Sequence, residues 1–175
     1  AVVRNVLEDH ALALAHRRLV LAVDAAPASV AGDAEGLRVV IDNLVSNAIK
    51  FSPPGGRLQL RMDVQPEEVH LSVIDSGPGI APGEEERIFD PAVRGTAAQS
   101  SGAPGSGHGL AIARDLAQAW GSRFVDLGAV AVDGFQRPVD DRQGPQAEEV
   151  ELHQAGGYNV VLVELGHQAV TGLVA

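Results

Sequence analysis

The 175-residue sequence contains no cysteine, which excludes a disulfide framework, a thiolate metal site and a cysteine nucleophile. Only 3% of the residues are aromatic, so valine, leucine, isoleucine and alanine must build the core. No apolar run approaches the roughly 20 residues that a membrane-spanning helix needs, and no signal peptide is recognisable. We therefore expect a chain of a reducing compartment, with no membrane segment within it.

Positive charge is also scarce, since the formal net charge is -10 at pH 7. Such an acidic chain is unsuited to binding a nucleic-acid backbone, although a local basic pocket for a small anion stays possible. The length fits one domain with a substantial core. Hydrophobic residues make up 45% of the chain and charged residues 21%, as in an ordinary globular protein.

The most informative stretch is the hexapeptide DSGPGI at residues 75–80, which follows a short apolar run at residues 69–74. This run predicts a β-strand that ends at Asp75. A carboxylate at a strand end can accept a hydrogen bond from a fixed donor, and glycines let the backbone approach a flat ligand. The same residue types also make ordinary turns, so the motif gains weight only from its neighbours.

A helix is predicted over residues 34–51, with Asp33 as its N-cap. Its apolar residues form one wide stripe at helical spacing. Beside that stripe, Asn43, Asn47 and Lys50 share one narrow face. Asparagine is a poor helix former, so two on one face indicate either a site for a hard cation and a phosphate or an ordinary solvated face. The helix alone leaves both interpretations equally open.

The rest of the chain predicts a mixture of helices and strands. Residues 2–19 carry a helical apolar stripe, and we interpret His10 and His16 within it as surface histidines. The expected strands are residues 19–23, 58–64, 69–74 and 158–165, with further candidates at 123–127 and 129–132. The strands at 58–64 and 69–74 should pair as an antiparallel hairpin.

Residues 95–107 contain almost no large apolar residue. They are expected to form a mobile loop, which is either a linker or, because it lies between two glycine motifs, a lid over a ligand. A short acidic helical turn precedes it, whose Ile88 and Phe89 should pack inward. The motif GSGHGL at residues 105–110 then opens a helix that runs to residue 120. Backbone N–H groups at such a helix start bind phosphate well, and the motif fits neither the Rossmann nor the P-loop pattern.

These motifs together resemble the ATP-binding catalytic domain of sensor histidine kinases, a fold shared with gyrase, heat-shock chaperone and mismatch-repair ATPases. Residues 42–51 resemble the N box, residues 75–80 the first glycine box, residues 88–91 the F box and residues 105–110 the second glycine box. The resemblance implies an α+β fold, a two-layer α/β sandwich of the Bergerat type with helices over one face of a mixed, mostly antiparallel sheet. We expect one domain over residues 1–175, with a lid at about 90–108 and an atypical insertion at about 126–156.

The resemblance also implies ATP and Mg²⁺ as ligands and a role for individual residues. Asn47 would coordinate Mg²⁺, Asn43 would lie beside the phosphates, and Lys50 would neutralise phosphate charge. Phe51 would pack near the adenine, and Asp75 would accept a hydrogen bond from the adenine amino group. The remaining nucleotide contacts implied by the motifs are Gly77, Gly79 and Ile80 at the base, Arg94 in the lid, and Ser106, Gly107, His108, Gly109 and Leu110 at the phosphates.

The sequence also departs from the family pattern. No His-Glu/Asp-x-x-x-Pro acceptor motif is present, so the phosphoacceptor histidine and its dimerisation domain are expected in missing upstream sequence or in another chain. His108 replaces the usual aliphatic residue of its box and is either a bystander or a phosphate contact. Residues 120–122 (WGS) replace the usual His-Gly-Gly. Asn43 stands where hydrolytic relatives carry Glu, which favours transfer to a protein acceptor over rapid ATP hydrolysis.

We therefore predict the cytoplasmic catalytic domain of a membrane-associated sensor histidine kinase. It would bind ATP or ADP, transfer the ATP γ-phosphate to a histidine outside this chain and act indirectly on a response regulator. The alternative is a non-catalytic nucleotide-sensing module of the same fold. A third hypothesis, an ATP-hydrolysing relative or an anti-sigma-type serine kinase, is disfavoured by the F box and by Asn43.

Overall fold

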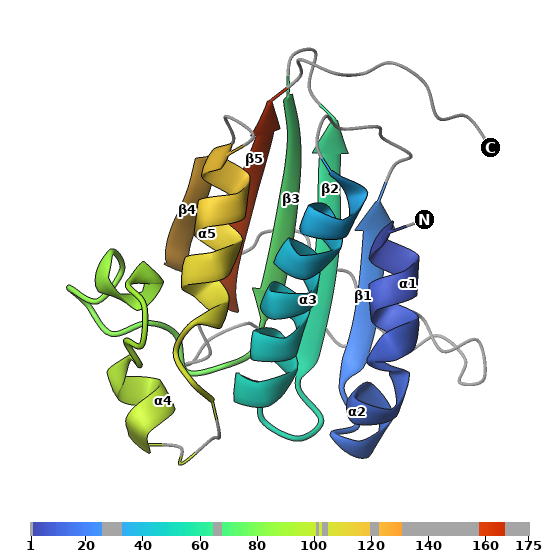
Figure 1. Ribbon diagram of the computed structural model, residues 1–175. Coiled ribbons are helices and arrows are strands. Elements are labelled where there is room, and N and C mark those ends of the chain that lie inside the picture. Colours follow the sequence, from blue (N-terminus) through green and yellow to red (C-terminus); the bar gives the residue numbers. More distant parts are fainter. Residues whose placement is uncertain are drawn as a thin grey trace.

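The computed structural model describes residues 2–25, 33–64, 68–100, 102, 105–119, 123–130 and 158–166. Two layers make up the fold, a five-stranded sheet and a set of helices that cover one of its faces (Figure 1). The two-layer α+β sandwich predicted from the sequence is therefore confirmed.

The sheet has the strand order β1-β2-β3-β5-β4. Its strands are β1 (Val20–Ala25), β2 (Arg57–Val64), β3 (Glu68–Asp75), β4 (Arg123–Val130) and β5 (Tyr158–Gly166). β1 and β2 are parallel, and the other neighbouring pairs are antiparallel. Parallel strands need a crossover connection, which helix α3 supplies between β1 and β2, whereas β2 and β3 form the predicted hairpin. The hairpin places Asp75 at the end of the central strand.

The covering layer consists of α1 (Val2–Asp9), α2 (Ala11–His16), α3 (Ala34–Phe51) and α5 (Gly109–Ala119). α3 lies in the middle and packs against α1 on one side and α5 on the other (Figure 1). The segment between β3 and α5 contains a short 3-10 helix, η1 (Arg87–Phe89), and the five-residue helix α4 (Thr96–Ser100). Among the described residues, no helix combines the length and apolar character needed to cross a membrane.

Side chains fix both ends of α3. The carboxylate of Asp33 accepts hydrogen bonds from two backbone N–H groups of the first turn, at 2.9 and 3.4 Å, as its N-cap position predicts. At the other end, the guanidinium of Arg17 donates to the carbonyl oxygens of Lys50 at 2.9 Å and Ser52 at 3.0 Å. A cation at a helix C-terminus also interacts favourably with the helix dipole. The C-terminal turn of α3 is therefore held in place from α2.

The hydrophobic core lies between α3 and the sheet. Ile41 and Val45 of α3 are 1% and 0% exposed, as their place on the apolar stripe predicts. Alternate residues of the hairpin face them, because strand side chains alternate between the two sides of a sheet. These residues are Leu58 and Leu60 of β2 and Val69, Leu71 and Val73 of β3. Burying a side chain of this size contributes about 1.5–3 kcal/mol, so apolar packing holds α3 on the sheet.

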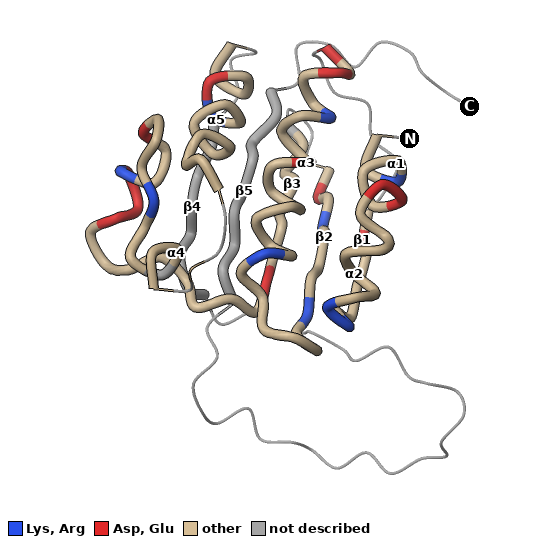
Figure 2. Tube along the Cα trace, turned by 60° about the horizontal axis from the view of Figure 1, so that its bottom comes forward, with Lys and Arg blue, Asp and Glu red and all other residues tan. Residues whose placement is uncertain are grey.

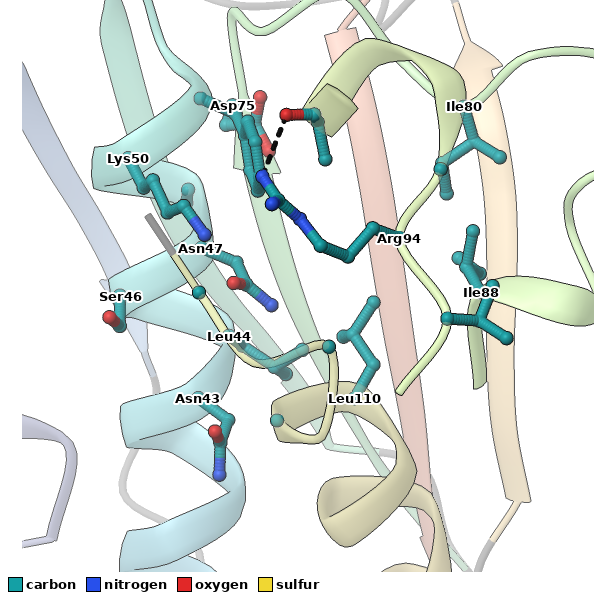
Figure 3. Close-up of a pocket in the computed structure, with 18 of the residues that line it drawn as sticks. Asn43, Leu44, Ser46, Asn47, Lys50, Asp75, Ile80, Ile88, Arg94 and Leu110 are labelled. Carbon is teal, nitrogen blue, oxygen red and sulfur yellow. Dashed lines mark hydrogen bonds between the residues drawn. The ribbon is translucent and has the colours of Figure 1, made fainter. Parts of the chain in front are cut away.

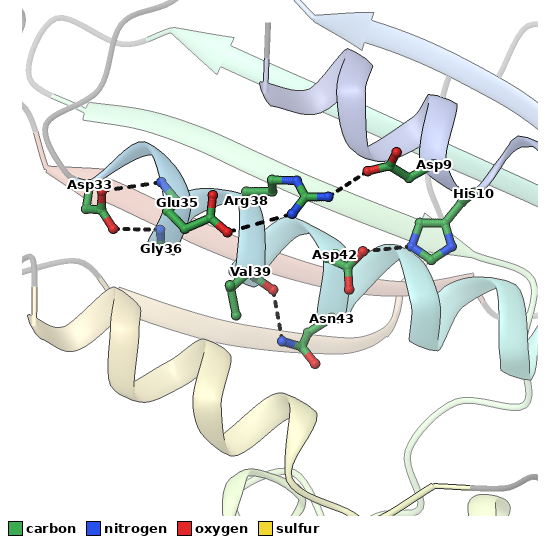
Figure 4. A network of polar contacts seen from close by, with 9 residues as sticks. All are labelled: Asp9, His10, Asp33, Glu35, Gly36, Arg38, Val39, Asp42 and Asn43. Carbon is green, nitrogen blue, oxygen red and sulfur yellow. Dashed lines mark hydrogen bonds and ion pairs between the residues drawn. The ribbon is translucent and has the colours of Figure 1, made fainter.

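Polar contacts tie the N-terminal helices to α3 (Figure 4). Arg38 Nη2 lies 2.7 Å from Asp9 Oδ2, and one turn further along α3, Asp42 Oδ1 lies 2.9 Å from His10 Nε2. His10 is therefore not an isolated surface histidine, and its backbone (φ -92°, ψ 3°) separates α1 from α2. Residues 2–19 thus form two helices rather than one continuous stripe, while His16 is exposed as expected.

The C-terminal strands differ from the prediction in one respect. The two candidate strands at residues 123–127 and 129–132 are a single strand, β4, with a register shift between Asp126 and Gly128. Such a bulge adds a residue to one strand without ending the pairing. The first residues of the expected insertion at 126–156 therefore belong to the sheet, and residues 131–156 lie outside the described residues, as do residues 120–122.

Candidate functional site

A cavity of about 380 Å³ opens between α3, the end of β3 and the segments that lead to α4 and α5 (Figure 3). All of the site residues predicted from the motifs line this cavity except Gly77 and His108. Segments that are more than 60 positions apart in the sequence, such as Asn43 and Gly109, thus meet at one site. The roles given to these residues remain predictions.

The two exceptions lie beside the cavity. Gly77 is buried, and its N–H donates to Asp75 Oδ1 at 2.6 Å, so it orients the carboxylate rather than lining the pocket. His108 is exposed, and its carbonyl oxygen accepts a hydrogen bond from the Ile112 N–H at 2.9 Å in the first turn of α5. The bystander interpretation of the His108 side chain fits this placement better than a phosphate contact.

Helix α3 supplies the polar wall of the cavity. Because Asn43, Asn47 and Lys50 are spaced by about one helical turn, all three line the same cavity (Figure 3). Asn43 Nδ2 donates to the Val39 carbonyl oxygen at 2.9 Å, which fixes the amide (Figure 4). The two asparagines and the lysine are therefore part of a pocket and not an ordinary solvated face.

Two cations face each other in the cavity. Lys50 Nζ lies 4.8 Å from the centroid of the Phe51 ring, and Arg94 extends from the opposite side and donates to the Ala98 carbonyl oxygen at 2.9 Å (Figure 3). Partial burial, and next the charge of Arg94, lower the pKa of Lys50 below its ordinary value. Figure 2 shows that α3 and the segment that leads to α4 each carry Lys or Arg residues together with Asp and Glu residues. An anion bound between Lys50 and Arg94 would relieve their repulsion.

Glycines bring the second wall close to these side chains. A Cβ atom at Gly109 would lie 2.5 Å from Asn43 Oδ1, and a Cβ atom at Gly105 would collide with Lys50 Nζ. Gly107 has a φ of +76°, and a Cβ there would lie 2.7 Å from the Val93 carbonyl oxygen. Glycine therefore lets the loop before α5 place bare backbone against the polar face of α3, and at Gly107 the neighbouring backbone leaves no room for a side chain. Backbone N–H groups at a helix start favour an anion there.

The other end of the cavity combines a carboxylate with apolar side chains. Asp75 ends β3, and the following loop turns at Gly79, whose φ is +81°. Ile80, Ile88 and Leu44 add apolar surface to the same lining. A slot with an oriented carboxylate at one side and apolar walls suits a flat ring that carries a hydrogen-bond donor.

Glu84 also lines the cavity, although none of the motifs predicted it. Its carboxylate accepts hydrogen bonds from Thr96, at 2.9 Å from the backbone N–H and 2.5 Å from Oγ1, and these bonds hold the pKa of Glu84 below its usual range. Within residues 95–107, which were expected to form a mobile loop, residues 96–100 form the helix α4. Twelve positions separate Glu84 from Thr96, so no local pattern marks the pair.

The donor atoms of the cavity fit a magnesium ion that arrives with phosphate. Within the described part of the chain, no group of three or more His, Cys, Asp or Glu side chains could hold a metal on its own. The lining instead offers the amides of Asn43 and Asn47. Mg²⁺ takes oxygen ligands, keeps several waters and is usually held by one or two protein oxygens together with substrate phosphates.

Helices cover one face of a mixed sheet, and an asparagine-bearing helix and a glycine-rich helix start surround one cavity. These features define the class of α/β sandwich that the motifs predicted. The family described as histidine kinase-, DNA gyrase B- and HSP90-like ATPase matches residues 32–163. The chain therefore belongs to this family.

Two curated relatives narrow the comparison. The chain is 44% identical over 95 residues to the signal transduction histidine-protein kinase/phosphatase MprB of Mycobacterium ulcerans. The aligned stretch covers 54% of this chain and 18% of that protein. The chain is 38% identical over 125 residues to the sensor histidine kinase WalK of Bacillus subtilis. This aligned stretch covers 67% of this chain and 20% of that protein. The chain thus spans about a fifth of the length of these curated relatives.

Solved structures show the same likeness. The mycobacterial sensor histidine kinase MprB matches with a TM-score of 0.71 at 28% identity, covering 94% of this chain and 93% of that one. The catalytic domain of the histidine kinase ThkA matches with a TM-score of 0.69 at 20% identity, covering 95% and 92%, and shows a likeness of fold alone. The likeness to the MprB and WalK kinases favours a kinase catalytic domain over the non-catalytic sensing module.

Proposed function

We propose that this chain binds Mg²⁺-ATP in the cavity beside α3 and transfers the γ-phosphate to a histidine outside this chain. One observation carries the proposal. Two amides and a lysine on one face of α3 oppose a glycine-rich helix start across a single cavity. Membership of the kinase and ATPase family and the likeness to sensor histidine kinases support it.

The base would occupy the end of the cavity near Asp75. The carboxylate of Asp75 is oriented by the Gly77 N–H at 2.6 Å and would accept a hydrogen bond from the adenine amino group. Gly79 and Ile80 would shape the slot around the ring, and Phe51 would pack near it. A fixed carboxylate would thereby select a base that carries a donor at this position.

The phosphates would lie between the two walls. Lys50 and Arg94 would neutralise their charge from opposite sides, and the backbone of Ser106, Gly107, Gly109 and Leu110 would donate to their oxygens. Asn47 would hold the Mg²⁺, with Asn43 beside it. When bound, the ion would neutralise the negative charge that develops on the phosphates during transfer.

The chain's own residues supply positioning rather than a base for water. Asn43 is an amide and cannot take a proton from water, and the Glu84 carboxylate is engaged with Thr96. Phosphoryl transfer depends mainly on position and charge neutralisation, so an incoming imidazole needs no activating base from this chain. The acceptor would come from a phosphoacceptor-histidine dimerisation domain, which would pass the phosphate to a response regulator. We infer that the domain works in the cytoplasm as part of a membrane-associated sensor.

The direct test is phosphotransfer. The purified chain is incubated with γ-labelled ATP, Mg²⁺ and a separately supplied helical dimerisation domain that carries a histidine, and the same domain without its histidine is the control. We expect label on the histidine with the wild-type chain and none with Asn47→Ala. ATP binding without any label on histidine would instead identify a sensing module.

A further inference from the structure

Glu84 is an acid on the lining of a cavity proposed to bind a polyanion, and the proposed mechanism gives it no task. Its backbone belongs to the body of the domain. The Glu84 N–H donates to the Ala81 carbonyl oxygen at 3.0 Å, and its own carbonyl oxygen accepts from the Ile88 N–H at 3.0 Å. Ile88 is only 6% exposed, so the backbone of Glu84 is bonded to a residue that is buried in the domain.

The Glu84 side chain reaches across to the start of α4. Both of its carboxylate oxygens contact Thr96: the backbone N–H donates at 2.9 and 3.2 Å, and the hydroxyl donates at 2.5 Å. The carboxylate also packs closely under this end of α4, because a Cβ atom on Gly95 would lie 3.0 Å from Glu84 Oε2. One side chain thus joins the body of the domain to α4.

Helix α4 and Arg94 form one folded unit. Arg94 Nη2 donates to the Ala98 carbonyl oxygen at 2.9 Å, and Gln99 Nε2 donates back to the Arg94 carbonyl oxygen at 2.7 Å. α4 has five residues, far fewer than an isolated helix needs for stability. Thr96, Gln99 and Ser100 are exposed. Polar contacts, rather than burial of these side chains, must therefore hold the unit in place.

We propose that Glu84 is a positioning residue, which anchors Thr96 and thereby fixes α4 and the Arg94 guanidinium at the cavity. This inference rests on the proposed function only where it assigns Arg94 to the phosphates. Two other roles for a carboxylate at this place, ligating a cation or activating water, would draw on the same oxygen lone pairs that accept from Thr96. The tests below separate these roles from the anchor.

The first experiment uses the chain without nucleotide and is therefore independent of the proposed function. Hydrogen exchange of the backbone amides of residues 95–100 is compared in the wild type, Thr96→Val and Glu84→Gln. Glu85→Gln is the matched control, because Glu85 is an exposed neighbour that loses the same charge. We expect exchange about two- to fivefold faster in the first two variants, the size that exposed polar contacts carry. Unchanged exchange in both, or an equal rise in Glu85→Gln, would overturn the anchor.

The second experiment measures how fast a fluorescent ATP analogue dissociates in the presence of Mg²⁺. Thr96→Val and Glu84→Gln should each raise the dissociation rate about two- to fivefold, and neither should raise it further once Arg94→Gln is present. Additive effects on top of Arg94→Gln would contradict positioning through Arg94. A changed Mg²⁺ dependence in Glu84→Gln but not in Thr96→Val would make Glu84 a metal ligand instead. If the wild type binds no nucleotide, the proposed function fails. The hydrogen-exchange experiment still tests whether Glu84 anchors Thr96.

Discussion

The two walls of the cavity are built in opposite ways. α3 is an 18-residue helix with a buried apolar stripe, and side chains cap it at both ends, Asp33 at the start and Arg17 at the finish. The facing segment between residues 84 and 109 contains the five-residue helix α4, held by surface hydrogen bonds, and glycines that pack backbone against α3. One wall is fixed by the core, and the other is fixed by polar contacts and close approach.

Because of this difference, the α3 wall should contribute most to the stability of the domain, whereas the placement of Arg94 for a ligand should depend on the facing segment. Regions with many buried apolar contacts open only with the whole domain, whereas segments held by exposed hydrogen bonds open locally at low cost. The side chains of α3 should therefore keep their positions whether or not a ligand is present. Arg94, on the other wall, should depend on local contacts. Each prediction below tests one side of this contrast.

The largest effect is expected in the core under the fixed wall. Ile41→Ala removes a side chain that is 1% exposed and should lower the free energy of unfolding by about 2–5 kcal/mol. Arg94→Gln should change it by less than about 0.5 kcal/mol, because the residue lies on the weakly held wall. Urea denaturation of both variants measures this. Comparable losses in the two variants would remove the contrast between the walls.

The next effect concerns the carboxylate at the end of β3. Asp75→Asn should weaken binding of adenine nucleotides about 10- to 100-fold, because a charge-assisted hydrogen bond to the base is lost. The amide can still accept from the Gly77 N–H, so the loop should keep its conformation. Calorimetric titration measures the affinity, with the exposed Asp90→Asn as control. Unchanged affinity in Asp75→Asn would refute the role of Asp75.

The contact between the walls can be tested at Gly109. Alanine favours a helix over glycine by about 1 kcal/mol, but a Cβ atom here would lie 2.5 Å from Asn43 Oδ1. Gly109→Ala should therefore destabilise the chain by about 1–3 kcal/mol, as overpacking does. In an Asn43→Ser background, which removes that oxygen, the same change should become stabilising. Thermal unfolding of the wild type, the two single variants and the double variant shows whether the sign reverses.

The smallest effect is a pH dependence of binding. In the chain without ligand, partial burial and the charge of Arg94 lower the pKa of Lys50 below the ordinary lysine value of 10.5. A bound polyanion favours the ammonium form of Lys50 and raises this pKa. At a pH between the pKa of the free chain and the pKa of the complex, binding therefore takes up a proton. Affinity should be full below the lowered pKa and decline as the pH rises through it.

Titrations with a triphosphate between about pH 7 and pH 10 measure the decline. Arg94→Gln removes one cause of the lowered pKa and should move the decline to higher pH. Lys50→Met should remove the decline altogether. A decline that persists unchanged in Lys50→Met would assign the titration to another group.

The sequence predicts the fixed wall better than the facing one, for a physical reason. The α3 stripe, the Asp33 cap and the hairpin are local patterns, in which periodicity and neighbouring residues set the structure. The four motifs are local too, and they contain most of the residues that line the cavity.

The missed features are contacts between distant residues. Arg17 reaches the Lys50 carbonyl oxygen across 33 positions, and Glu84 reaches Thr96 across 12. Neither pair leaves a spacing or composition that marks it in the chain. The helix break at His10 and the register shift in β4 likewise involve partners that are distant in the sequence, Asp42 of α3 and strand β5.

The account depends most on the claim that the cavity binds a magnesium nucleotide against α3. Isothermal titration calorimetry with a non-hydrolysable ATP analogue tests this directly, on the wild type and on Asn47→Ala, each with and without Mg²⁺. We predict saturable binding by the wild type that Mg²⁺ strengthens, and a much smaller Mg²⁺ effect in Asn47→Ala. Absence of binding heat in the wild type, or an identical Mg²⁺ effect in both proteins, would contradict the account.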